Sequence, residues 1–159
     1  RSLVGSEMCI RDRIDDGRIE EAKTVLKESY QKNPDELNAF YEGFFKEKQV
    51  GFEAVKAEYE ALAKANENSW RILFSIANVF SYNEYFKEAI QMWQKTFDCM
   101  PKPRYTDSFE AMAQCCVRMG DHESAVEYYK KELELLREDW GLKYGAEVDA
   151  LEEKIRALQ

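Results

Sequence analysis

The chain has few of the residues that interrupt helices and few of those that build reactive sites. Its 159 residues include three prolines, seven glycines and a single histidine. Proline and glycine break helices and mark turns, so their scarcity leaves long stretches free to be helical. Hydrophobic residues make up 45% of the chain and charged residues 34%, proportions that indicate a folded protein rather than a disordered one. We therefore predict an all-α fold.

An excess of positive charge and a long apolar run are also missing. Aspartate and glutamate number 31 against 23 lysines and arginines, which gives a net charge of −8. This balance disfavours binding to nucleic-acid phosphates and to anionic membranes, because both require clusters of Lys and Arg. No segment has the roughly 20 apolar residues that are needed to cross a bilayer. We expect neither a nucleic-acid partner nor a membrane partner for this segment.

The four cysteines form no motif. Cys115 and Cys116 are adjacent within a helical pattern, Cys9 and Cys99 lie far from them, and no Cys-x-x-Cys pair occurs. This spacing supports neither a disulfide framework nor a zinc site. We interpret the cysteines as small hydrophobic residues in a reducing compartment, and we predict a cytoplasmic location.

Motifs for catalysis and for cofactor binding are absent. The only histidine, His122, falls in a predicted turn and has no second histidine to pair with. The Gly-x-Gly-x-x-Gly, phosphate-loop and Gly-x-Ser-x-Gly motifs do not occur. Acid pairs such as Glu152–Glu153 are expected on solvated helix faces, because acidic residues are frequent throughout the chain. We predict no enzyme activity, no cofactor and no metal.

What the chain does contain is a repeated helical pattern. Ala22, Val55, Ala89 and Ala125 are spaced by 33, 34 and 36 positions, and a larger apolar residue follows each of them four positions later. These larger residues are Leu26, Tyr59, Trp93 and Tyr129. A period of about 34 residues with two helices per unit is typical of a helical repeat array, because one helix pair cannot bury its own apolar face.

Apolar periodicity and stop signals locate the individual helices. Asn33–Pro34, Val50–Gly51 and Pro101 each end a helical pattern, and Ser69 is a predicted N-cap. The predicted helices cover residues 19–30, 35–48, 52–65, 70–82, 85–100, 106–119, 122–137 and 146–158.

Several of these segments resemble the turn and second helix of a tetratricopeptide repeat. The likeness is strongest at residues 120–131, Gly-Asp-His-Glu-Ser-Ala-Val-Glu-Tyr-Tyr-Lys-Lys, and at residues 85–101, which begin Tyr-Phe-Lys-Glu-Ala-Ile. Residues 17–34 carry a weaker version. The resemblance implies a right-handed solenoid of antiparallel helix pairs, with a half repeat, about three repeats and a capping helix. The half repeat is expected at residues 14–34, the three repeats at about 35–68, 69–101 and 104–137, and the capping helix at about 146–158.

In such repeats small residues allow the two helices of a pair to approach closely. The matching positions on the first helices are Gly43, Ala77 and Ala113, which would face Val55, Ala89 and Ala125. The second unit departs from the pattern, because Val55 replaces the usual alanine and Glu67 stands where proline is common.

The resemblance also implies where a ligand would bind, since first helices line the concave groove of these arrays. The candidate groove residues are Phe40, Phe44, Arg71, Phe74, Asn78, Tyr82, Glu110 and Gln114. The alternative for the aromatic residues is a role in the core. Some family members clamp a carboxylate with Lys, Arg and Asn. Only Asn78 matches that set and Asp107 has the wrong sign, so we do not expect such a clamp.

The first thirteen residues do not fit the repeat. The string Arg-Ser-Leu-Val-Gly-Ser-Glu-Met-Cys-Ile-Arg-Asp-Arg resembles a translated sequencing adapter of the transposase mosaic-end type. The alternative is a natural N-terminal helix, because Leu3, Met8 and Ile10 are apolar. The segment carries three arginines and two acids, so without it the net charge would be −9. Ala22 would then lie on a second helix whose first helix is missing.

Taken together, these patterns favour a non-catalytic scaffold that binds a protein or peptide in the groove. The truncated N-terminal end would be a place for self-association. The alternative is the effector-sensing domain of a bacterial transcription regulator whose helix-turn-helix domain lies upstream of Ile14. That alternative depends on a short likeness of residues 135–142, followed by Leu151 and Ile155, to the end of such regulatory domains.

Overall fold

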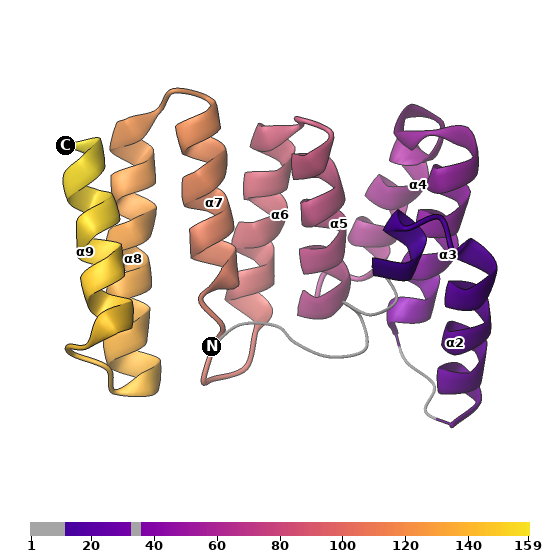
Figure 1. The fold of residues 1–159 in the computed structure, drawn as a ribbon, viewed down its shortest axis with the longest axis horizontal. Helices are drawn as coiled ribbons and strands as arrows, with labels where there is room; N and C mark the ends of the chain where they lie inside the picture. Colours follow the sequence, from indigo (N-terminus) through magenta and orange to yellow (C-terminus); the bar gives the residue numbers. More distant parts are fainter. Residues whose placement is uncertain (1–11, 33–35) are drawn as a thin grey trace. The chain divides into compact units, whose positions relative to one another are not determined.

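The computed structural model describes residues 12–32 and 36–159. Its described residues fall into an N-terminal unit that ends at Glu67 and a C-terminal unit, Asn68–Gln159 (Figure 1). We describe each unit by itself. The adapter-like segment lies almost entirely outside the described residues, so its interpretation stays a prediction; the adjoining residues 12–15 are helical.

The N-terminal unit contains α2 (Ile19–Lys32), α3 (Leu37–Val50) and α4 (Phe52–Ala65). Gly51 separates α3 from α4 with a φ of 91°, a conformation that residues with a Cβ rarely adopt. The side chain of Val55 is fully buried. A Cβ at Gly43 would lie 3.3 Å from a ring carbon of Tyr59, so the small residue predicted at this position makes room for the tyrosine four residues after Val55.

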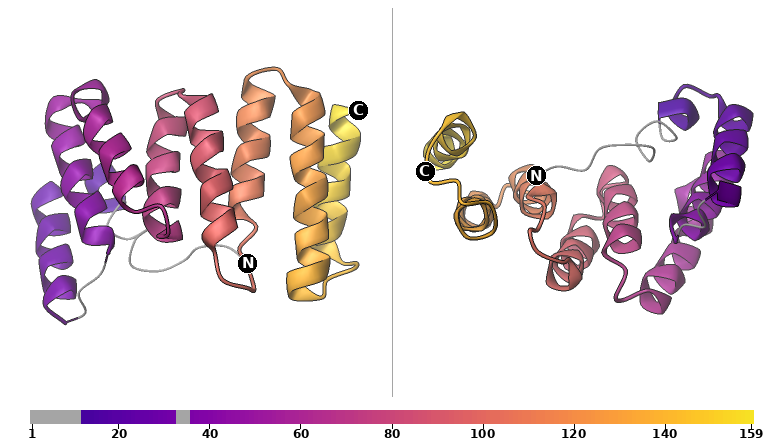
Figure 2. Two further views of the ribbon diagram at one scale, coloured as in Figure 1. Left: turned by 180° about the vertical axis from the view of Figure 1, so that it is seen from behind. Right: turned by 90° about the horizontal axis from the view of Figure 1, so that it is seen from below.

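The C-terminal unit contains two antiparallel helix pairs and a final helix. The first pair is α5 (Trp70–Tyr82) with α6 (Phe86–Cys99), and the second is α7 (Asp107–Arg118) with α8 (His122–Trp140). Helix α9 (Ala146–Leu158) packs against α8. The right-hand view of Figure 2 shows these helices nearly end on, with α5, α7 and α9 in one layer and α6 and α8 in the other.

The predicted small residues lie where the paired helices touch. Ala77 on α5 and Ala89 on α6 are fully buried, as are Ala113 on α7 and Ala125 on α8. Ala113 and Ala125 belong to one core cluster with Leu151 and other apolar residues of α8 and α9. Because these side chains end at Cβ, the backbones of the two helices can pack closely. This packing gives each helix of the unit a buried face and an exposed face.

Local signals in the sequence explain where the helices begin. The Ser69 hydroxyl accepts a hydrogen bond from the Ile72 N–H, which confirms the predicted N-cap of α5. Asp121 caps α8 in the same way, because its Oδ1 accepts from the Ser124 N–H at 3.1 Å. Hydrogen bonds from the side chain and from the backbone of Ser124 lower the pKa of the Asp121 carboxyl group.

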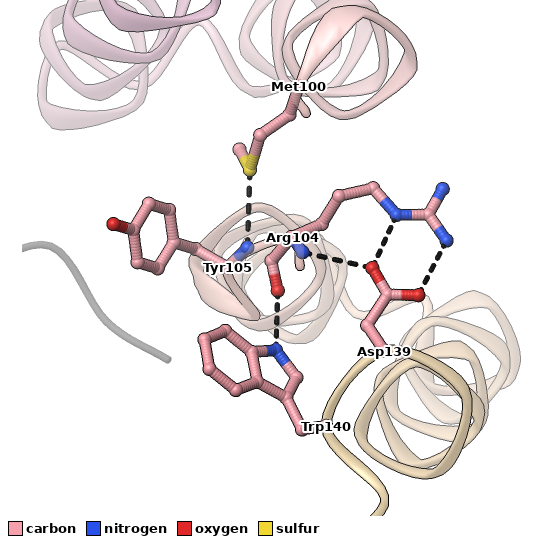
Figure 3. Close-up of polar contacts among 5 residues, drawn as sticks. All are labelled: Met100, Arg104, Tyr105, Asp139 and Trp140. Carbon is pink, nitrogen blue, oxygen red and sulfur yellow. Dashed lines mark hydrogen bonds and ion pairs between the residues drawn. The ribbon is translucent and has the colours of Figure 1, made fainter. Parts of the chain in front are cut away.

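The end of α8 differs from the prediction, which stopped the helix at Arg137. The helix continues to Trp140 and closes with Gly141 in the left-handed conformation. The last turn is held by contacts with a segment 35 residues earlier in the chain, shown in Figure 3. Asp139 accepts three hydrogen bonds from Arg104: from the backbone N–H at 2.9 Å, from Nε at 2.8 Å and from Nη2 at 3.0 Å.

We call this group of contacts the Arg104 clasp. The indole N–H of Trp140 donates to the Arg104 carbonyl at 2.7 Å, and the guanidinium of Arg104 lies over the Phe97 ring. The Asp139 side chain is only 1% exposed, and its hydrogen bonds with Arg104 lower the pKa of its carboxyl group. The clasp therefore ties the loop between α6 and α7 to the end of α8, which sequence periodicity could not reveal.

Candidate functional site

Four of the predicted groove residues share one face of α5. Arg71, Phe74, Asn78 and Tyr82 recur at intervals of three or four positions, which places them in a line along the helix. Phe74 is partly buried, and Tyr82 is 83% exposed. The structure thus gives α5 a face on which an accessible aromatic ring lies among polar side chains.

Two further predicted residues share a face of α7, and one of them, Glu110, contacts α9 there. The Gln114 amide donates to Glu110 Oε1 at 3.4 Å. Lys154 of α9 reaches the same carboxylate, with its Nζ 3.5 Å from Glu110 Oε1. The side chains of Glu110 and Lys154 are both partly exposed, at 41% and 44%. The α7 residues are therefore continuous with a polar surface that includes α9.

Helices α5, α7 and α9 form one layer of the C-terminal unit, and their exposed side chains come from three separate parts of the sequence. The surface of this layer carries Arg71, Phe74, Asn78 and Tyr82 of α5, Asp107, Glu110 and Gln114 of α7, and Glu147 and Lys154 of α9. We call it the α5/α7/α9 face. Its aromatic residues lie on α5, and the ion pair of Glu110 with Lys154 joins α7 to α9.

The other two predicted groove residues are part of the core of the N-terminal unit. Phe40 is fully buried and its ring lies 5.6 Å from that of Phe44 and 5.9 Å from that of Tyr59, measured between centroids. Phe44 is also buried, although the ammonium group of Lys48 lies over its ring. Phe40 and Phe44 therefore lie in the core, as in the alternative that the sequence left open for the aromatic residues. We therefore leave them out of the α5/α7/α9 face.

Sequence reasoning missed one residue of this region, Glu132 on α8. Glu132 is 5% exposed, and its Oε2 has no hydrogen-bond partner among residues 12–32 and 36–159. Burial, reinforced by the nearby carboxylate of Glu110, raises the pKa of Glu132 to about 8. The signal was present in the sequence, because Glu132 interrupts the apolar stripe formed by Ala125, Tyr129 and Leu136 at helical spacing.

Cys115, Cys116 and His122 are not part of the α5/α7/α9 face. Cys115 and Cys116 are buried, and burial raises the pKa of both thiols, to about 11 for Cys116. Thiols of this kind are poor nucleophiles at neutral pH, because the thiolate is the reactive form. His122 is exposed at the first turn of α8. Within residues 12–32 and 36–159, no three or more His, Cys, Asp and Glu side chains are grouped so that they could hold a metal ion.

The arrangement of paired helices matches known structures. A structure of PilF from Pseudomonas aeruginosa superposes on 95% of this chain with a TM-score of 0.62 and 16% sequence identity. The structure titled MamA AMB-1 superposes on 89% of the chain with a TM-score of 0.54 and 20% identity. Both are tetratricopeptide-repeat proteins. The fold is that of the tetratricopeptide repeat.

The predicted fold class, an antiparallel helix-pair array, is thereby confirmed. No family model and no curated protein sequence matches the chain. The chain spans 64% of the length of the PilF chain and 74% of the MamA chain. At 16% and 20% sequence identity, the similarity to these structures establishes the fold but does not identify a ligand. None of the described helices combines the length and the apolar character that a membrane span requires.

Proposed function

We propose that the chain is a non-catalytic scaffold that binds a protein segment or peptide on the α5/α7/α9 face. The observation that carries this proposal is the exposure of Tyr82 in line with Phe74 on a helix whose opposite side is buried. Tyrosine is enriched in protein interfaces, because its ring offers a large apolar area and its hydroxyl a hydrogen bond. The polar side chains of Arg71, Asn78 and Gln114 would fix the register of the bound segment.

The repeat fold supports the same proposal. A stack of helix pairs leaves one layer of helices with long, regularly spaced faces, and extended ligands can follow such a surface across several units. On α5 the aromatic residues Phe74 and Tyr82 alternate with the polar residues Arg71 and Asn78, as expected of a helix face that contacts a peptide through both anchors and hydrogen bonds.

A selection experiment tests this proposal. A library of random dodecapeptides displayed on phage would be selected against the full chain, and the affinities of the enriched peptides would be measured by fluorescence anisotropy. We expect Tyr82→Ala and Phe74→Ala to weaken binding about tenfold each, which is typical of an aromatic anchor. Tyr144→Ala is the matched control, because Tyr144 is 84% exposed but lies in the loop before α9.

The alternative of an effector-sensing domain makes a different prediction. Such a domain would bind a small molecule, and the selection would enrich no peptide family. Equal losses in Tyr82→Ala and Tyr144→Ala would also contradict the proposed surface. If Phe74→Ala unfolds the domain, Phe74 is a core residue and the surface depends on Tyr82 alone.

A further inference from the structure

A pocket of about 320 Å³ lies between α6 and α8, where the segment that holds Arg104 enters α7. Its apolar part consists of Phe97, Phe109 and Leu135, which come from α6, α7 and α8. The rings of Phe97 and Phe109 lie 4.4 Å apart, measured between centroids. None of the side chains that line the pocket belongs to the α5/α7/α9 face. We call it the clasp pocket, and its volume is at the lower end of the range for small-molecule sites.

Arg104 gives the clasp pocket a hydrogen-bond donor that is already fixed in place. Asp139 accepts hydrogen bonds from Nε and Nη2, and the central carbon of the guanidinium lies 4.4 Å from the centroid of the Phe97 ring. The remaining nitrogen, Nη1, points away from Asp139 in Figure 3 and has no acceptor within the described part of the chain. The Arg104 side chain is 19% exposed, so a ligand can reach it. Because the guanidinium loses little freedom on binding, Nη1 suits a carboxylate.

The α8 side of the clasp pocket carries charges of both signs. Lys131, Glu134 and Glu138 recur at intervals of three and four positions, which places them along one face of the helix. All three are exposed, and none of them forms an ion pair within residues 12–32 and 36–159. The ammonium group of Lys131 lies 5.4 Å from the centroid of the Tyr128 ring. The pocket therefore offers a cation and two carboxylates to a ligand, next to its apolar part.

Neither an anion nor a cation alone complements the clasp pocket. A lone carboxylate would be attracted by Lys131 and repelled by Glu134 and Glu138, and a lone cation would experience the reverse. A free α-amino acid carries a carboxylate and an ammonium group on the same carbon atom, and an apolar side chain on that atom would cover Phe97 and Phe109. The end of a peptide carries only one of the two charges, so it complements the pocket less well.

We propose that the clasp pocket binds a free α-amino acid with an apolar side chain. The carboxylate of the ligand accepts hydrogen bonds from Arg104 Nη1 and from the ammonium group of Lys131. The ammonium group of the ligand donates to Glu134 and Glu138, and its side chain packs on the apolar part of the pocket. This site lies outside the α5/α7/α9 face, so the inference goes beyond the proposed peptide-binding function and does not depend on it.

Titration of the full ¹⁵N-labelled chain with L-leucine and with L-phenylalanine tests the inference by amide chemical shifts. We expect at least one of them to bind with a dissociation constant of about 1 mM or lower. The largest shifts should be those of the Arg104 and Leu135 amides and of the Trp140 indole N–H, which donates to the Arg104 carbonyl. The Tyr82 amide, on the α5/α7/α9 face, should not shift.

Three ligand analogues separate the parts of the recognition. N-acetyl-L-leucine lacks the ammonium group, L-leucinamide lacks the carboxylate, and glycine keeps both charges without an apolar side chain. We expect each analogue to bind at least about tenfold more weakly than L-leucine, because each loses a charge-assisted hydrogen bond or the burial of an apolar side chain.

Two variants of exposed residues assign the charges of the ligand to the protein. Lys131→Gln should reduce the preference for leucine over leucinamide at least about threefold, and Glu138→Gln should reduce the preference for leucine over N-acetyl-leucine to a similar extent. Lys130→Gln and Glu127→Gln are the matched controls. Both side chains are exposed on α8 but do not line the clasp pocket, so these variants should keep both preferences.

The inference is overturned if neither amino acid causes a shift at concentrations up to about 10 mM. Equal affinity for leucine and for its two blocked forms would also overturn it, because the pocket would then recognise only the apolar side chain. The same conclusion would follow if the largest shifts lay on the α5/α7/α9 face, or if Lys131→Gln and Glu138→Gln behaved like their controls.

Discussion

Replacing Glu132 with glutamine should change how the stability of the C-terminal unit depends on pH. The pKa of this carboxyl group is about 8 in the folded protein, against an ordinary value of 4.5. Between these two values the folded state holds a proton that the unfolded state has lost. The free energy of unfolding must therefore fall as the pH rises through this window. Below about pH 4.5 both states are protonated and the penalty vanishes.

The size of the effect follows from the pKa difference. Each pH unit between the two pKa values corresponds to about 1.4 kcal/mol, so the penalty reaches about 3 kcal/mol at pH 7 and about 5 kcal/mol at pH 8. Glutamine has nearly the same shape and does not ionise, so it removes this dependence. Its amide group also needs partners in the core, which adds an offset that does not vary with pH. The informative quantity is thus the difference in the free energy of unfolding between Glu132→Gln and wild type, and how this difference changes with pH.

Urea denaturation followed by circular dichroism measures this quantity at pH 4.5, 6, 7 and 8. We expect the stability of Glu132→Gln relative to wild type to increase by about 3 kcal/mol between pH 4.5 and pH 7. The Glu134→Gln variant should follow the wild-type curve, because that side chain is exposed. Parallel curves for wild type and Glu132→Gln would refute the reasoning, since they would mean that Glu132 ionises equally in the folded and unfolded states.

Three further predictions concern the fold and its thiols. Asp139→Ala should lower the free energy of unfolding by about 3 kcal/mol in urea denaturation, because it removes a buried carboxylate that accepts three hydrogen bonds from the partly buried Arg104. The stabilisation by Asp139 is present above the usual carboxyl pKa, and acid titration should show its loss as the pH falls through the lowered pKa. Ala89→Trp should cost several kcal/mol by overpacking the α5–α6 contact, whereas Ala150→Trp on the exposed side of α9 should leave the melting temperature nearly unchanged. Cys116 should react with a thiol reagent at pH 7.5 only as fast as the unit unfolds, and rapid labelling in the native state, read by mass spectrometry, would contradict its burial.

The parts of the fold that depend on local sequence were predictable. The helices predicted at residues 52–65, 70–82 and 146–158 have the same bounds as α4, α5 and α9. Their ends depend on signals within a few residues, such as Gly51 before α4 and the N-cap Ser69 before α5. The extension of α8 to Trp140 was not predictable, because Arg104 holds it from 35 positions away. The periodicity of apolar residues along a helix does not indicate which distant segment of the chain the helix contacts.

The candidate site was predictable in part, for a similar reason. Spacing placed Phe74 and Tyr82 on one face of α5, but it could not distinguish them from Phe40 and Phe44. These two rings are buried against each other, and Tyr59 also packs against Phe40. Whether an aromatic residue is exposed depends on which side chains pack against it in space. Glu132 could have been found, because a charged residue inside an apolar stripe is visible in the sequence; its neighbours on α7 and α9 could not.

The central claim is that a peptide occupies the α5/α7/α9 face. Mapping of amide chemical shifts in the ¹⁵N-labelled chain, during titration with the tightest selected peptide, tests it most directly. The account predicts that the largest shifts cluster on α5, α7 and α9, around Tyr82, Glu110 and Lys154, with little change on the exposed side of α6 and α8. Shifts that cluster instead on α6 and α8 would contradict it.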